Sequence, residues 1–130
     1  MPKSFDLSRV FVHLRDGGDA ETVKITKSFW TSSSVASGKY DRILGAFEFE
    51  SDEDLHAAMQ EIHPNSDEVL YLVSGALDVL LEQPGGEQRI PLESGQFAIV
   101  PRGVWHRLTM RAPGKLVFIN SRTGMRSRGA

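Results

Sequence analysis

Cysteine is absent from the 130-residue sequence, which excludes disulfide bonds and cysteine-based zinc sites. No apolar run approaches the roughly 18 residues that a membrane-spanning helix needs. The first 20 residues contain Asp6, Asp16 and Asp19 and no continuous apolar segment, so the sequence predicts no secretory signal and a cytoplasmic location. A net charge of −2 argues against nucleic acid as a partner.

The size and composition are those of one soluble globular domain covering residues 1–130, with 40% hydrophobic and 25% charged residues. Charge is distributed unevenly along this domain. Residues 48–68 contain eight acidic residues and no Lys or Arg, whereas residues 102–130 contain seven basic residues and no acid. One interpretation is an acidic site with a basic segment that binds an anion or a second subunit; the other is two solvated faces. Residues 121–130, rich in Arg, Ser and Gly, are expected to form a flexible tail.

Side-chain periodicity predicts β-structure over most of the chain. Short segments alternate apolar and polar residues or are wholly apolar, and turn residues separate them at intervals of about 8–12 residues, as in a sandwich or barrel. These segments are 23–28, 47–50, 69–73, 77–82, 89–92, 97–100 and 116–119. The polar stretch Thr31–Gly38 is expected to be a loop.

Residues 52–60 have local helix propensity, with a capping Ser51 and acids in the first turn. Pro64 would end such a helix. The motifs described next require extended chain over 57–63 instead, which leaves open a single helical turn at 52–56.

Two motifs carry the functional signal. The first, about 61–75, contains His63-x4-Glu68-x6-Gly75; the second, 95–106, reads Gly95-x5-Pro101-x-Gly103-x2-His106. The order and spacing of these motifs resemble the two signature motifs of the cupin superfamily. That resemblance implies an all-β cupin-type jelly-roll barrel (a double-stranded β-helix of the RmlC-like type), usually a homodimer, with a small-molecule pocket inside. We expect about eight to ten strands, of which the first 30 residues supply one or two that either stay within the chain or exchange with a partner subunit.

In such a barrel, neighbouring strands would bring His63, Glu68 and His106 together at the mouth as a two-histidine, one-carboxylate set suited to Fe, Mn, Ni or Zn. The sequence departs from the family pattern, His-x-His followed by Glu, because Glu61 stands where the first histidine is usual. Glu61 is therefore a fourth candidate metal ligand, or else a carboxylate that orients His63 or serves as general acid or base. The divalent metal itself is left open, since the site is also compatible with being metal-free.

The pocket wall is predicted from residues near these motifs on the same strand faces: Met59, Leu72, Phe97, Leu108 and Met110. Asp67, His13 and His56 are expected to lie on the surface or in loops. Tyr71 and Trp105 are expected to be packing or dimer-interface aromatics. Arg102 is expected to be a solvated loop residue, with binding of a substrate carboxylate as the alternative.

Two classes of function remain open at this stage. One is a small metal-dependent enzyme, dioxygenase-like or isomerase-like, acting on a small oxygen-rich molecule. The other is a barrel that binds or senses a small ligand without chemistry, because fold alone does not decide function.

Overall fold

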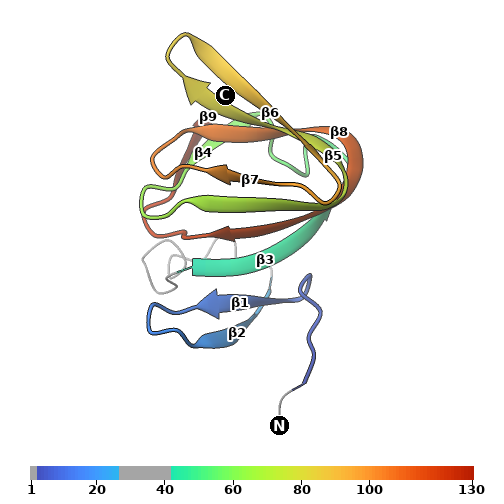
Figure 1. Ribbon diagram of the computed structural model, residues 1–130, viewed down its shortest axis with the longest axis vertical. Helices are drawn as coiled ribbons and strands as arrows, with labels where there is room; N and C mark the ends of the chain where they lie inside the picture. The colour runs from blue at the N-terminus through green and yellow to red at the C-terminus, as the bar shows by residue number, and fades with distance from the viewer. Residues whose placement is uncertain (1–2, 27–41) are drawn as a thin grey trace.

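The computed structural model describes residues 3–26 and 42–130, and within these ranges the chain forms strands and no helix (Figure 1). The strands are β1 Val10–Leu14, β2 Ala20–Lys24, β3 Arg42–Phe49, β4 Met59–Ile62, β5 Glu68–Gln83, β6 Gly86–Glu93, β7 Phe97–Val100, β8 His106–Asn120 and β9 Arg126–Gly129. They join one nine-stranded sheet, and all of its pairings are antiparallel. The all-β jelly-roll prediction is confirmed. The loop predicted at Thr31–Gly38 lies outside the described residues, and in the described part of the chain no helix is long and apolar enough to cross a membrane.

Two long strands, β5 and β8, form the spine of the barrel. They pair from Val69↔Ile119 to Leu81↔His106, with register shifts midway. β7 and β6 add to successive halves of β5, and β3 and β4 add to opposite ends of β8, so the sheet folds back over itself (Figure 1). The sequence pattern predicts turn residues between the segments 69–73 and 77–82. Gly75, with a φ of 88°, instead lies at an irregular bend within the continuous strand β5.

The N-terminal hairpin β1–β2 joins the same sheet because β1 pairs with β3. The first 30 residues thus supply two strands, within the predicted one or two. It is anchored by Phe11, which packs edge-on against Phe118 with ring centroids 5.6 Å apart. A Cβ on Gly45 would lie only 2.6 Å from the Phe118 ring, so the missing side chain of Gly45 makes room for this aromatic pair.

The predicted flexible tail at 121–130 is instead largely ordered by contacts with the barrel. Residues Arg126–Gly129 form β9, which pairs with β4 from Ile62↔Arg126 to Met59↔Gly129. Arg128 lies 4.1 Å from the centroid of the Trp105 ring and donates a hydrogen bond to Gln60. Cation–π and backbone contacts therefore order a segment whose composition suggested disorder.

The helix suggested by local propensity at 52–60 does not form, and residues 52–58 are a series of turns. The carboxylate of Asp52 accepts a hydrogen bond from the backbone N–H of Met110 on β8, 58 residues away. His56, whose φ of 52° is incompatible with a right-handed helix, interrupts the turns, and Met59 onward is strand.

Candidate metal centre

Three strand ends position the candidate ligands. Glu61 on β4 lies directly opposite His106, the first residue of β8, and Glu68 is the first residue of β5. His63 follows β4, and its backbone carbonyl accepts a hydrogen bond from Gly103. The bend of the second motif, where Gly103 has a φ of 75°, thereby holds the histidine of the first motif.

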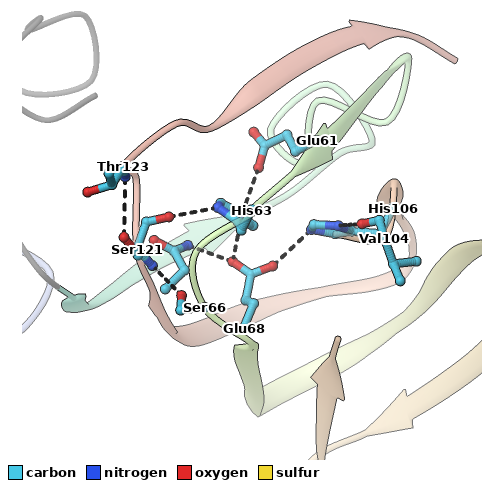
Figure 2. A network of polar contacts seen from close by, with 9 residues as sticks. Glu61, His63, Ser66, Glu68, Val104, His106, Ser121 and Thr123 are labelled. Atoms are coloured by element: carbon cyan, nitrogen blue, oxygen red, sulfur yellow. Dashed lines mark hydrogen bonds and ion pairs between the residues drawn. The ribbon is translucent and has the colours of Figure 1, made fainter. Parts of the chain in front are cut away.

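The structure brings all four predicted residues together (Figure 2). Ligand atoms of Glu61, His63 and His106 lie within 4.8 Å of one another. Glu68 lies between the two imidazoles, with Oε1 2.9 Å from His106 Nε2 and Oε2 3.5 Å from His63 Nε2. The second carboxylate, Glu61, approaches His63 Nε2 to 3.7 Å. Both histidines and Glu68 are buried, whereas the side chain of Glu61 is 38% exposed.

The tautomer of His63 is fixed by its neighbour Ser121. His63 Nδ1 lies 3.0 Å from the carbonyl oxygen of Ser121, which only accepts hydrogen bonds, so Nδ1 carries the proton. Ser121 is itself held by a backbone hydrogen bond to the Ser66 hydroxyl (Figure 2). The lone pair of His63 Nε2 therefore points at the two carboxylates, and this buried atom has no hydrogen-bond partner among the described residues.

His106 is held through Nδ1 in the same way, but its Nε2 has a hydrogen-bond partner. Its Nδ1 donates to the backbone carbonyl of Val104 at 3.1 Å, which leaves Nε2 facing Glu68. Burial lowers the pKa of His106, but the hydrogen bond and charge of Glu68 raise it more, so its net pKa lies above the ordinary value. Burial raises the pKa of Glu61, yet contacts with His63 and the charge of Arg122 outweigh it, so its net pKa lies below the ordinary value. Both shifts favour charged forms that face one another across the site.

This donor set fits a divalent cation. Both imidazoles have Nδ1–H fixed by a carbonyl oxygen and direct Nε2 toward Glu68, which is how metal-binding histidines are oriented. His63 Nε2 carries a lone pair, and His106 Nε2 would give up its proton on binding a metal. Two carboxylates face the same point, so positive charge there is favoured.

Two further residues of the site were missed by sequence reasoning. Asn120 Nδ2 donates to Glu68 Oε2 at 2.6 Å, and Asn120 Oδ1 is buried without a hydrogen-bond partner in the described structure. Arg122 lines the cavity, and its burial lowers the pKa of the guanidinium despite the opposing charges of Glu61 and Glu68. Strand periodicity could have identified Asn120, because it lies on the same face of β8 as the inward-facing Leu116 and Phe118. No such pattern was available for Arg122, which falls in the segment predicted to be a flexible tail.

A cavity of about 480 Å³ adjoins these groups. Two of the predicted wall residues, Met59 and Leu108, line it. The other three predicted wall residues do not line the cavity. Leu72 is completely buried in the core, Phe97 is 63% exposed, and Met110 packs against the core outside the cavity. Phe97 was assigned to the wrong face, since Ala98 and Val100 are the buried residues of β7.

The remaining predicted residues fall on several surfaces. Asp67 is exposed and accepts a hydrogen bond from the backbone N–H of Arg102, which is a loop residue away from the cavity. His56 is exposed at the cavity rim. His13 is only 4% exposed and bonds to Glu21, which corrects its assignment to the surface. Of the two aromatics, Tyr71 is 39% exposed, and Trp105 packs under the arginines of β9.

The fold and the site together define the class of structure: an antiparallel barrel with imidazoles and carboxylates clustered beside a cavity. The sequence matches the Cupin domain family over residues 48–121, and the chain therefore belongs to the cupin family. No curated protein matches the chain.

Similar solved structures share this fold. A cupin superfamily protein from Desulfitobacterium hafniense has a TM-score of 0.50 and 16% identity, with 62% of this chain and 66% of that chain covered. Oxalate decarboxylase from Bacillus subtilis, studied for its Mn(II) centers, has a TM-score of 0.52 and 18% identity, covering 68% and 23%. HppE with Fe(II) and substrate has a TM-score of 0.50 and 17% identity, covering 61% and 46%. The chain thus spans less than half of the last two proteins, and these identities show a common fold alone.

Proposed function

We propose that His63, Glu68 and His106, together with Glu61, bind a divalent transition metal at the mouth of the barrel. The observation that carries this proposal is His63 Nε2, a buried lone pair with no hydrogen-bond partner in the described structure, aimed at two carboxylates. Such an atom is costly to bury without a partner, and a cation supplies one. Two carboxylates and two imidazoles favour Mn or Fe(II), with Ni and Zn as alternatives.

We propose further that the protein is an enzyme of dioxygenase-like or isomerase-like type acting on a small oxygen-rich molecule. A bound metal would supply Lewis acidity toward an oxygen of the substrate. Glu61 has the most exposed side chain of the four candidate ligands and lines the cavity, so it is the group best placed to accept or return a substrate proton. Structural neighbours studied with Mn(II), or with Fe(II) and substrate, support this choice.

One observation favours a second function, ligand binding without metal chemistry. Glu68 already bonds to both His106 and Asn120, so the carboxylate is satisfied without a cation. A binding or sensing barrel would keep this arrangement and use the cavity alone.

A calorimetric titration of metal-free protein with Mn²⁺ and with Zn²⁺ separates the two functions. We expect about one metal per chain, with affinity reduced about 100-fold or more in His63→Ala and His106→Ala because each loses a ligand. The matched control is His56→Asn, which alters an exposed histidine and suits its positive φ of 52°; it should bind as the wild type does. Absence of binding by the wild type, with binding restored in Glu61→His, would instead support the metal-free function.

We also propose a homodimer formed through the outward face of β5 and β7. Four of the six exposed large hydrophobic residues in the described structure lie there: Tyr71, Val73, Phe97 and Ile99. Tyr71 pairs directly with Phe97 across the two strands, so the patch is continuous. Light scattering should give twice 14.4 kDa for the wild type and for the control Gln88→Lys on exposed β6, but 14.4 kDa for Ile99→Lys. A monomeric wild type would contradict this interface.

A further inference from the structure

The cavity has two chemically different ends. Its polar end holds Glu61, Glu68, Asn120 and Arg122, and the apolar side chains of Phe47, Leu70, Leu108, Leu116 and Phe118 form much of the remaining wall. Asp54, His56, Arg107 and Ser127 also line the cavity. One stretch of chain shows the change most directly. Alternate residues Leu116, Phe118, Asn120 and Arg122 all line the cavity, so the lining passes from hydrocarbon to amide to guanidinium within seven residues.

We infer that the oxygen-bearing ligand proposed for this site is a small amphipathic monoanion, with its oxygens gathered at the polar end, a carboxylate at Arg122 among them, and an apolar body along the barrel interior. The inference rests on the proposed metal site, since the metal contributes to the charge of the polar end. It assigns to Arg122, which lies outside both sequence motifs, a role in selecting the ligand.

Formal charges support a single negative charge on the ligand. Among the described residues of the polar end, Arg122 contributes +1 and Glu61 and Glu68 contribute −1 each, so with a divalent cation these charges sum to +1. Of the other charged residues described along the cavity, Asp54 is exposed and Arg107 forms an ion pair with Glu87. A monoanion neutralises the interior, whereas a neutral ligand leaves it charged in a setting of low dielectric.

Asn120 contributes to the polar end through Glu68. It lines the cavity between Phe118 and Arg122, and its Nδ2 donates a hydrogen bond to Glu68 Oε2, which holds that carboxylate in place.

The cavity is large enough to hold a ligand with an apolar body as well as a carboxylate. Its volume is about 480 Å³. An anion of two carbons would leave most of the apolar wall in contact with water, whereas an aromatic or branched aliphatic body would cover it.

Three probes test both parts of the inference: acetate, phenylacetate and the neutral isostere 2-phenylacetamide. Each is titrated by calorimetry into protein whose Mn²⁺ occupancy has been measured first. Phenylacetate should bind about tenfold or more tighter than acetate, because a phenyl group is buried. It should also bind about tenfold tighter than 2-phenylacetamide, because a charged hydrogen bond to Arg122 is added.

Variants assign the two effects to residues. Arg122→Gln should reduce the acid-to-amide preference to near one with Mn²⁺ occupancy unchanged, and Arg122→Lys should restore part of it. Arg102→Gln is the matched control, because this exposed arginine pairs with Asp67 away from the cavity, and it should bind all three probes as the wild type does. Leu108→Gln should weaken phenylacetate more than acetate.

The outcomes separate the two proposals. Failure of the wild type to take up Mn²⁺ contradicts the proposed metal site. A wild-type protein that binds phenylacetate no better than 2-phenylacetamide, or an Arg122→Gln variant that keeps the preference, overturns the inference about the ligand.

Discussion

Substitution of Gly114 by alanine should be among the most destabilising single-methyl changes in this protein. Gly114 lies on β8 at the bend of the spine, where its backbone crosses Ser74 and Gly75 of β5. An added Cβ would overlap the main-chain carbonyl of Ser74 and lie 2.7 Å from the nitrogen of Gly75. Main-chain atoms of a paired strand cannot rotate away as a side chain can, so relief requires the two strands to separate.

We estimate the cost at about 3 kcal/mol, the upper end of the usual range for overpacking a core. This is a large part of the roughly 5–15 kcal/mol that stabilises a domain of this kind. Urea unfolding followed by circular dichroism measures it, and a Tm lower by about 10 °C should accompany it.

Two other glycines are matched controls. Gly129 has open space and no positive φ, so Gly129→Ala should change the free energy of unfolding by less than about 0.5 kcal/mol. Gly95 also has open space but a φ of 88°, so Gly95→Ala should cost about 1 kcal/mol from backbone conformation alone. A Gly114→Ala protein as stable as Gly129→Ala would refute the close strand crossing and the bend that it creates.

Three further predictions concern the site and its support. Glu68 raises the pKa of His106, so the contact between them stabilises the metal-free fold fully below pH 6.5, and this stabilisation is lost as the pH rises through the raised pKa. Thermal melts at several pH values should show the loss in the wild type but not in His106→Gln. Asn120→Ala removes a hydrogen bond to the Glu68 carboxylate, so we expect about 2 kcal/mol lower stability in urea and, by competition titration, about tenfold weaker metal binding; wild-type values for both would refute this role. Trp105→Leu removes the ring under Arg128, so β9 should detach more often and limited trypsin digestion should cleave there faster than in the wild type.

Residue spacing along the strands predicts those parts of the site that depend on where a strand begins or ends. Glu68 and His106 are the first residues of β5 and β8, as the motif spacing predicts. Antiparallel pairing alone would set these two residues at opposite ends of the β5–β8 ladder, and the irregular bend midway along the two strands lets Glu68 Oε1 lie 2.9 Å from His106 Nε2. Glu61 and His63 are two residues apart at the end of β4, so extended chain places both toward the same point. Motif spacing predicts such contacts because it counts residues along strands.

The parts that sequence reasoning missed depend on contacts between distant segments. Residues 126–129 look like a disordered tail until β4 and Trp105 provide partners for their backbone and arginines. Residues 52–58 form turns that carry a hydrogen bond from Met110 to Asp52, a contact that periodicity does not indicate. His13 shares the buried face of β1 with Phe11, and Arg122 lines the cavity at the point where the chain turns from β8 to β9.

The most direct test of the account is the metal content of protein purified without a polyhistidine tag or chelator, measured by mass spectrometry beside His63→Ala. The account predicts close to one divalent transition metal per chain in the wild type and very little in the variant, because His63 supplies the buried lone pair. Equal metal content in the two proteins, or none in the wild type, would contradict the proposed centre.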